Sequence, residues 1–409
     1  MRKIPSFVIL ATFVLVTACF LTYQITFSET DKFWKSKIDE MLSSTGPDVS
    51  GDLGEISETG NANYLYPVEE KTLSDGVLEG YVSALPDSFS MYMNETEYKN
   101  YLDFTNNTNN IGVGVNTLYD SSLDGICIIN VYKGSPAEGA GIVPGDLITH
   151  VNSVPVKKLG YYGVMAELGT GTENSAVNVT IKKRTGVSVS LVLNKSKVTS
   201  DRITGEKLKN KIGLIKISGF ESGDYEVFKQ ELESLITSDC EKFIIDVRNN
   251  AGGSIEVVSK ILDFLLGEGS MFTISDKSGA TNTMTSDANA VPYPLAVIVN
   301  ERTVCGAEVF ASSLRESGAA RLFGVPTYGK ASKQSVFKLS GDTAVSLSTT
   351  KYAPAFGGDF DGTGVVPHEE IMLSDDALLR FTTLSKDEDA QLQAAIEYLK
   401  DKNLEGIRD

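Results

Sequence analysis

The second half of the chain alternates short apolar runs with amphipathic runs of helical spacing, and this alternation limits the folds available to it. From about residue 200 the apolar runs have the length of buried strands, and polar turns separate them from the helical runs. Such a chain packs helices against a sheet, so we expect an α/β layer architecture for residues 199–409. The expected strands are 212–217, 242–247, 295–299 and 321–325, and the expected helices are 225–235, 255–266, 307–314 and 389–399.

A nucleophilic side chain follows one of these strands. Cys305 comes after the third expected strand and opens the helix that follows it, whereas Cys127 and Cys240 lie in apolar runs and are expected to be buried structural thiols. Lys330 comes after the fourth strand, and Gln334 lies four positions further on. A thiol at a strand-to-helix turn with a lysine nearby is a nucleophile with a candidate base. The chain has two histidines, and neither lies in such a setting, so a hydrolase built on this sequence uses lysine as its base.

The helix start beside Cys305 affects the chemistry expected there. The positive end of the helix macrodipole favours a thiolate, and a nearby Lys330 ammonium favours it further. Gly252 and Gly253 follow an expected strand and precede a helix, so their N–H groups can face a developing negative charge. Together with the N–H of Gly306 they are the candidates for an oxyanion hole, and the sequence leaves open which of the two glycines donates. No metal and no cofactor is expected.

Three segments around these residues resemble the carboxyl-terminal processing peptidases, the tail-specific group of family S41. The resemblance runs in the family's order from about Tyr64 to Leu399 and implies a crotonase-like peptidase core. One departure stands out, because Cys305 occupies the position where the family has serine. The similar segments are 299–308 (nucleophile), 324–334 (lysine base and orienting glutamine) and 246–253 (Asp-Leu-Arg-x-Asn-Pro-Gly-Gly turn).

Residues 109–198 resemble a PDZ domain, a mainly-β module inserted before the core. Gly112-Val113-Gly114-Val115 is similar to its carboxylate-binding loop, and 134–137 with 140–146 are similar to its internal Gly-Ser-Pro-Ala and Pro-Gly-Asp runs. Such a loop offers backbone N–H groups to a terminal carboxylate while the peptide adds a strand to the sheet edge. The resemblance implies protein or peptide substrates with free C-termini.

The predicted function is an extracytoplasmic endopeptidase of the C-terminal processing type. The resemblance implies that Lys330 acts as the base and that Gln334 orients it. Cys305 and Lys330 can share one proton in either direction, as thiol and amine or as thiolate and ammonium. Two alternatives stay open: a catalytically inactive relative that binds peptides through its PDZ domain, and a cysteine introduced on purpose to silence the enzyme.

The first 27 residues are a membrane-targeting segment. An apolar run near the ~20 residues that span a bilayer follows Arg2 and Lys3, which place the N-terminus in the cytoplasm and the body outside a single-pass protein. The alternatives are a lipoprotein acylated at Cys19, where 16–19 resembles a lipobox, and a secreted protein with a cleaved signal peptide.

The net charge of -17 argues against nucleic acid as a partner.

The part between this segment and the PDZ domain divides by composition. Residues 28–63 are polar and without sustained apolar periodicity, so we expect a tether. Residues 64–108 are expected to be a helical segment, because 71–101 has helical spacing; within it, 87–93 resembles the family's lead-in to the PDZ domain. The expected apolar face consists of Leu73, Val77, Tyr81 and Leu85. The sequence leaves the oligomeric state open, a homo-oligomer included.

Overall fold

The computed structural model describes residues 49–106, 110–198, 201–287 and 291–402. The predicted targeting segment and Cys19 lie outside these residues. Among the residues that are described, no helix is long and apolar enough to cross a bilayer. The chain divides into two compact units, Met1–Ser74 and Asp75–Asp409.

The first unit contains α2 (Val49–Asn63) and the beginning of α3 (Glu70–Ser83). The helix α2 forms the last 15 residues of the segment 28–63, for which we expected a tether. No residue of α2 is buried, so local contacts such as the bond from Asn63 Nδ2 to Thr59 O at 2.9 Å support it instead of a core. Without a buried face the helix leaves no apolar period in the sequence, which explains why it was missed.

The helical segment before the PDZ domain is divided into two helices, a break that the helical spacing over 71–101 did not indicate. It consists of α3, the short strand β1 (Met91–Met93) and α4 (Glu95–Thr105), which begins after a capping box formed by Asn94 and Glu97. Pro86 lies in the gap, and the residue before a proline avoids the helical region. The expected apolar face is not a core face, since Tyr81 is 73% exposed.

The PDZ domain is built on a mainly antiparallel sheet in the order β3-β4-β5-β7-β8, in which β3 is an edge strand. The helix α7 and the strands bury one apolar cluster that includes Val113, Ile128 and Leu168. Its elements are β2 (Ile111–Gly112), β3 (Val115–Leu118), β4 (Ile126–Val131), α5 (Pro136–Gly139), β5 (Leu147–Val151), β6 (Val154–Pro155), α6 (Val156–Leu159), α7 (Tyr161–Gly169), β7 (Ala176–Lys182), β8 (Ser188–Asn194) and β9 (Ser196–Lys197).

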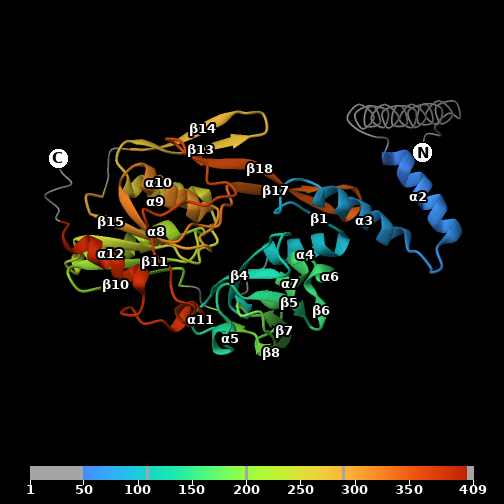
Figure 1. Cartoon of the computed structure of the whole chain (residues 1–409), viewed down its shortest axis with the longest axis horizontal. Helices are drawn as coiled ribbons and strands as arrows, with labels where there is room; N and C mark the ends of the chain where they lie inside the picture. Colours follow the sequence, from blue (N-terminus) through green and yellow to red (C-terminus); the bar gives the residue numbers. More distant parts are fainter. Residues whose placement is uncertain (1–48, 107–109, 199–200, 288–290, 403–409) are drawn as a thin grey trace, which may run out of the picture. The chain divides into compact units, whose positions relative to one another are not determined.

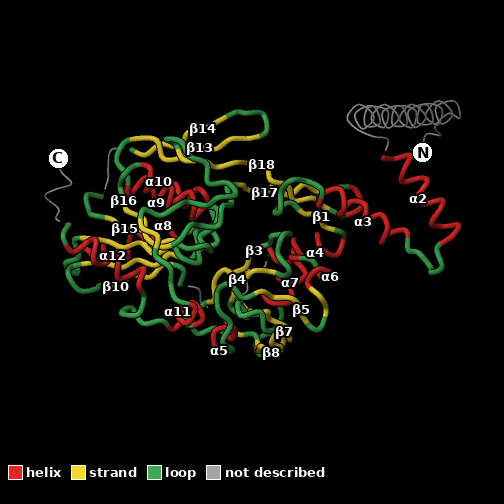
Figure 2. The backbone as a smooth tube through the Cα atoms, viewed as in Figure 1, coloured by secondary structure: helices red, strands yellow, loops and turns green. Residues whose placement is uncertain are grey.

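The core contains a six-stranded sheet in the order β10-β11-β12-β15-β16-β19, parallel except for β10. Its strands β10 and β15 are labelled in Figures 1 and 2. The predicted α/β core with an inserted mainly-β domain is thus confirmed. The strands are β10 (Ile203–Lys207), β11 (Ile212–Ile217), β12 (Lys242–Asp246), β15 (Leu295–Val299), β16 (Ala320–Gly324) and β19 (Glu369–Glu370), and the helices are α8 (Asp224–Thr237), α9 (Ile255–Leu265), α10 (Gly306–Glu316), α11 (Asp375–Leu379) and α12 (Ala390–Lys400).

Both faces of this sheet are covered, which is why its strands read as unbroken apolar runs. Successive side chains of a strand point to opposite faces. Along β15, Val297 and Val299 join a cluster with residues of α8, α9 and α10, whereas Ala296 and Ile298 join a second cluster with residues of α12. The two clusters fix the sheet between its helices, and its strand ends carry the turns described below.

A second, antiparallel sheet joins distant parts of the chain. One edge of β18 pairs with β1 near its start and with β13 near its end, and the other edge pairs with β17. The residues before β1 are thereby brought close to the start of β17, although they precede the whole PDZ domain. The further strands are β13 (Gly269–Asp276), β14 (Thr281–Ser286), β17 (Ser332–Lys338) and β18 (Ala344–Pro354), and the short 3-10 turns are η1 (Ser340–Asp342) and η2 (Phe381–Thr383).

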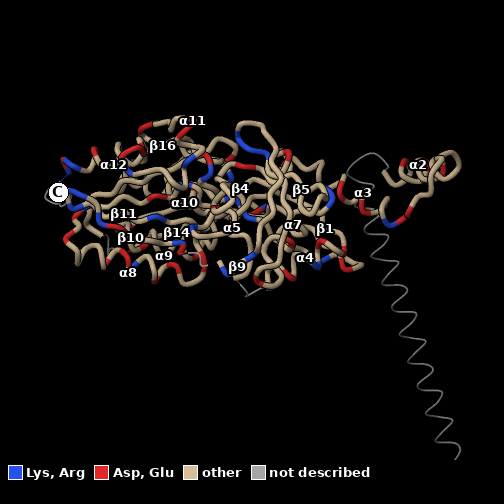
Figure 3. The backbone as a smooth tube through the Cα atoms, turned by 90° about the horizontal axis from the view of Figure 1, so that it is seen from below, with Lys and Arg blue, Asp and Glu red and all other residues tan. Residues whose placement is uncertain are grey.

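Acidic and basic residues are interspersed along the described chain (Figure 3). Many of them form exposed ion pairs, such as Lys211 with Glu241 and Lys386 with Glu206, both at 2.5 Å. Exposed pairs of this kind contribute little to stability, because water and salt screen the attraction.

Candidate active site

Cys305 occupies a sharp turn between β15 and α10. Its backbone has φ 53° and ψ −113°, a conformation that costs energy in a residue other than glycine and that occurs at functional sites. Its N–H donates to Glu308 Oε2 at 2.9 Å, so the first turn of α10 holds the strained residue in place. The thiol is therefore presented at the start of a helix, as predicted.

Lys330 lies between β16 and β17, with only 7% of its surface exposed. Its Nζ donates to Gln334 Oε1 at 2.7 Å and to the Ser332 carbonyl oxygen at 2.8 Å. The amide nitrogen of Gln334 in turn donates to Ser348 Oγ at 2.8 Å. These partners fix the orientation of the amide, and its oxygen faces the lysine.

The thiol and the ammonium converge on one acceptor. Cys305 Sγ donates to the Ser332 carbonyl oxygen at 3.6 Å, and this is the oxygen that Lys330 Nζ also contacts. Burial raises the pKa of Cys305, while the nearby Lys330 charge and the N–H of Gly306 lower it. The result differs from the expectation that helix and lysine favour the thiolate, because the loss of hydration around sulfur is the larger effect.

Glu308 is a functional candidate that the sequence reasoning missed as a separate residue. Its fully buried carboxylate accepts from the N–H groups of Cys305, Gly329 and Lys330 at 2.6–2.9 Å and from Thr327 Oγ1 at 2.5 Å. Burial raises its pKa, and these hydrogen bonds lower it. One side chain thus ties the nucleophile turn to the lysine loop. The signal was its place three residues after the helix start, the spacing of a capping box.

The glycine turn lies against the nucleophile turn. A Cβ on Gly252 would lie 2.8 Å from Gly306 N and 3.2 Å from Cys305 Cβ, so only glycine fits there. The N–H of Gly252 donates to Asn250 Oδ1 at 2.8 Å. The nitrogen of Gly253 lies 3.5 Å from the position that a Cβ on Gly306 would occupy. Because the N–H of Gly252 already donates within its own turn, Gly253 is the stronger oxyanion-hole candidate of the two.

An amide cluster that the sequence reasoning overlooked holds these two turns together. Asn300 Oδ1 accepts from Asn249 N at 2.9 Å, and Asn300 Nδ2 donates to Asn249 Oδ1 at 2.8 Å. Arg302 Nε donates to the same Asn249 oxygen at 2.9 Å, and Val304 N donates to Asn250 O at 2.8 Å. Each asparagine follows a buried strand, which was the available signal.

The four residues of the predicted carboxylate-binding loop line a cavity of about 310 Å³ beside β3 and α7. Gly114 has φ 81°, and a Cβ there would lie 2.2 Å from Ser135 Cβ. The N–H of Val113 donates to Leu168 O at 3.1 Å and is already paired. The further lining residues are Phe104, Asn110, Ile111, Asn116, Thr117, Tyr132, Tyr161, Met165, Leu168, Gly169 and Val198.

The PDZ domain also contacts the turns that carry Cys305 and Lys330. Tyr328, two residues before Lys330, donates its hydroxyl to Asp120. Cys127 and Ile129 of β4 form a small buried cluster with Val304, and Cys305 and Tyr328 pack against it. The predicted buried state of Cys127 and Cys240 is confirmed.

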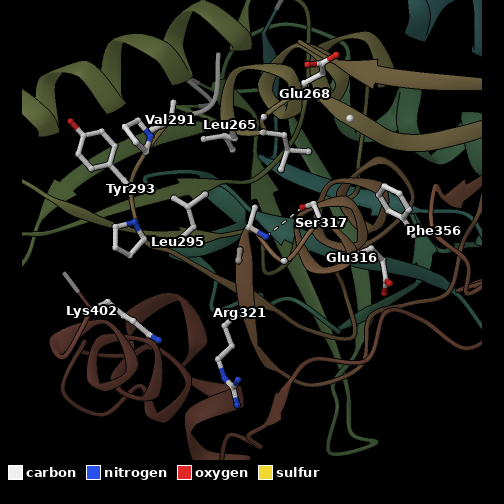
Figure 4. A pocket seen from close by; sticks show the side chains of 18 of the residues that line it. Leu265, Glu268, Val291, Tyr293, Leu295, Glu316, Ser317, Arg321, Phe356 and Lys402 are labelled. Atoms are coloured by element: carbon white, nitrogen blue, oxygen red, sulfur yellow. Dashed lines mark hydrogen bonds between the residues drawn. The ribbon is translucent and has the colours of Figure 1, made fainter. Parts of the chain in front are cut away.

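A larger cavity, about 1000 Å³, lies elsewhere (Figure 4). It is lined by the beginnings of β15 and β16, including Leu295 and Ala320, whereas Cys305 follows the end of β15. Sites in open α/β sheets form at the carboxyl ends of the strands. None of the predicted site residues lines this cavity, so size alone does not identify the site.

Comparisons with known proteins bear on the fold and the family of the chain. Residues 211–371 match "Peptidase family S41", and residues 128–183 match "PDZ domain". The fold is similar to that of "Photosystem II D1 C-terminal processing protease", with a TM-score of 0.65 and 24% identity over 80% of this chain and 89% of that one.

Two relatives show the same similarity in sequence. The chain is 30% identical over 310 residues to "Carboxyl-terminal-processing peptidase 2, chloroplastic" of Arabidopsis thaliana. The aligned residues make up 71% of this chain and 59% of the relative. It is 27% identical over 383 residues to "Carboxy-terminal processing protease CtpA" of Bacillus subtilis. The aligned residues make up 93% of this chain and 79% of that relative. The chain thus spans less than two thirds of the Arabidopsis protein. Its core is a peptidase family S41 domain joined to a PDZ domain, and the chain is a relative of the carboxyl-terminal processing proteases.

Proposed function

We propose that the chain is a membrane-tethered, extracytoplasmic endopeptidase that hydrolyses peptide bonds with the Cys305–Lys330 dyad. The observation that carries this proposal is the convergence of Cys305 Sγ and Lys330 Nζ on the Ser332 carbonyl oxygen. Burial of Lys330 and the strained backbone of Cys305 both cost stability. A catalytic role for the two residues accounts for this cost.

In the proposed reaction the thiolate of Cys305 attacks the carbonyl carbon of the peptide bond. The carbonyl oxygen becomes negative and accepts hydrogen bonds from the N–H groups of Gly306 and Gly253. The C–N bond then breaks, the Lys330 ammonium gives its proton to the departing amine, and a thioester remains. Neutral Lys330 takes a proton from the water that attacks the thioester, and this step releases the carboxylic acid and restores the thiolate and the ammonium.

The PDZ groove supplies the substrate in this proposal. A peptide that adds to the free edge of β3 would place its terminal carboxylate at the loop 112–115 and its last side chains among apolar residues such as Val115 and Met165. Protein substrates with free, apolar C-terminal tails follow from this chemistry. The membrane tether rests on the sequence of residues 1–27 alone.

The experiment that tests the dyad is detection of an acyl-enzyme. The full chain is mixed with an unfolded peptide that has an apolar C-terminus, quenched in acid and analysed by mass spectrometry. We expect a mass increase on Cys305 that Cys305→Ala abolishes without loss of peptide binding. Peptide binding without any adduct on Cys305, whether or not the peptide is consumed, would contradict the proposal.

The second candidate is a peptide-binding relative that does not cut. The raised pKa of Cys305 favours it, since a thiol that keeps its proton is a poor nucleophile. The same mass experiment decides between the two candidates.

A further inference from the structure

An aromatic ring from the start of the second unit lies over the candidate base. The Nζ of Lys330 lies 4.9 Å from the centroid of the Phe89 ring. Phe89 belongs to the turn before β1, and pairing of β1 with β18 brings this turn to the lysine. The N–H of Phe89 donates to Asp87 Oδ1 at 3.0 Å, and Ser90 Oγ accepts from Ser348 N at 3.1 Å. The turn is therefore held on both sides of the ring.

The partners of the lysine nitrogen suit its charged form. An ammonium group has three N–H donors and no lone pair. Two N–H groups point to the oxygens of Ser332 and Gln334, and the face of the Phe89 ring attracts a positive charge through its quadrupole. A neutral amine would keep the two hydrogen bonds and lose the attraction to the ring.

Charged groups also surround the lysine, and they need to be separated from the effect of the ring. Asp87 on the lead-in turn interacts electrostatically with Lys330, and Glu308 of α10 accepts from its backbone N–H. Asp361 accepts from the adjacent Ala331 N at 3.4 Å, whereas Lys333 of β17 adds a positive charge that acts on Cys305. All of these groups titrate, but the ring does not. Changing the ring alone therefore isolates its contribution.

We propose that Phe89 is a positioning residue whose ring holds Lys330 as an ammonium ion and so moves the proton shared by the dyad from Cys305 to Lys330. This inference rests on the proposed Cys305–Lys330 dyad. A thiolate attacks without a base, so the ring assists a cysteine nucleophile. A serine at the same position would need a neutral lysine, so the ring opposes a serine nucleophile. The effect of Phe89 consequently has opposite signs for the two nucleophiles.

The pH dependence of Cys305 alkylation measures this effect. The rate constant with iodoacetamide is followed across pH by mass spectrometry on the detergent-solubilised full chain. Phe89→Leu should raise the midpoint by roughly half to one pH unit, whereas Phe89→Tyr should leave it near its starting value. Phe356→Leu is the matched control, because this phenylalanine is 64% exposed and lines the cavity away from the site; it should not move the midpoint.

A graded series keeps the test valid if Phe89→Leu fails to fold. Phenylalanines carrying one, two or three fluorine atoms at position 89 keep the shape of the ring and weaken its negative face step by step. We expect the alkylation midpoint to rise along the series. A midpoint that stays constant, or a rate that falls equally at every pH, would overturn the role of the ring.

Two further variants separate this inference from the dyad itself. If Lys330→Ala does not move the midpoint of Cys305 alkylation, the dyad proposal fails. If Lys330→Ala moves the midpoint and the fluorinated series does not, only the role of Phe89 fails. When Phe89→Leu is added to Cys305→Ser, peptide hydrolysis at neutral pH should increase about two- to tenfold, because loss of the ring favours the neutral lysine that a serine needs. A decrease in hydrolysis would also contradict the inference.

Discussion

Cys305 shows how one residue receives opposing influences from its surroundings. Burial raises its pKa, and the Lys330 charge and the Gly306 N–H lower it by a smaller amount. A thiol whose pKa is raised keeps its proton to higher pH, so the reactive thiolate forms only as the pH rises toward the raised value. The nucleophile is then more reactive in alkaline than in neutral solution.

Limited alkylation tests this view of Cys305. Cys305 should label before Cys127, which is buried in β4 and whose pKa is raised to about 11, and before Cys240. The labelling rate should increase with pH, and Lys330→Ala should slow it because the charge that favours the thiolate is lost. Peptide mapping after short exposure gives the order. Equal labelling of the three cysteines would show that Cys305 has no special reactivity.

The contacts of single residues were predictable only where the partners are close in sequence. Lys330 and Gln334 are four positions apart, and the structure joins them through Nζ and Oε1. Glu308 follows Cys305 by a capping-box spacing and was within reach of the same reasoning. Phe89 was not, because its position over Lys330 results from strand pairing between distant segments.

At the scale of elements, the turn at 252–253 is a tightly constrained piece of backbone at the site. Gly253 has φ 133°, and a Cβ there would lie 2.1 Å from Phe220 O. Gly318 has φ 72° with nothing within 4 Å of a Cβ. Gly318→Ala should therefore cost only the backbone strain, about 1–2 kcal/mol. Gly253→Ala should cost at least about 1–3 kcal/mol more, since backbone atoms must move.

Chemical denaturation of the two glycine variants measures the difference. Gly253→Ala should also reduce any peptidase activity, because the N–H proposed for the oxyanion shifts with the turn, whereas Gly318→Ala should leave activity unchanged. Equal unfolding free energies for the two variants would show that the backbone near Phe220 moves to accommodate a Cβ on residue 253 at little energetic cost.

The groove beside β3 gives a second prediction at this scale. Amidation of the C-terminus of a binding peptide should weaken its affinity at least about tenfold, or roughly 1.4 kcal/mol, because the loop 112–115 no longer has a carboxylate to bind. Isothermal titration with the acid and amide forms measures the ratio. Equal affinities would show that the loop does not bind the carboxylate.

Prediction of elements succeeded where strands are buried on both faces. The strands expected at 212–217 and 295–299 coincide with β11 and β15, because an unbroken apolar run of that length is typical of a strand buried on both faces. The strand β1 within the helical segment expected at 64–108 was not predicted, since β1 is stabilised by its pairing with β18 and its own three residues carry little signal. The helix α2 was missed for lack of a buried face.

At the scale of the whole molecule, the proposed membrane tether predicts on which side of the membrane the body lies. With Arg2 and Lys3 on the cytoplasmic side, the body should lie outside the membrane. Protease added to spheroplasts should remove the body and leave cytoplasmic markers intact. A body that is protected until the cells are lysed would refute this topology.

The pairing of β1 with β18 also bears on when the site comes into being. The turn that contains Phe89 lies early in the chain, and the lysine and the strand that binds this turn lie late in it. A chain made from its N-terminus folds its early parts first, and contacts so far apart in sequence form slowly. Until β18 has been synthesised and paired, Lys330 has no aromatic cover. The topology thus delays assembly of the surroundings of the proposed dyad until most of the chain is present.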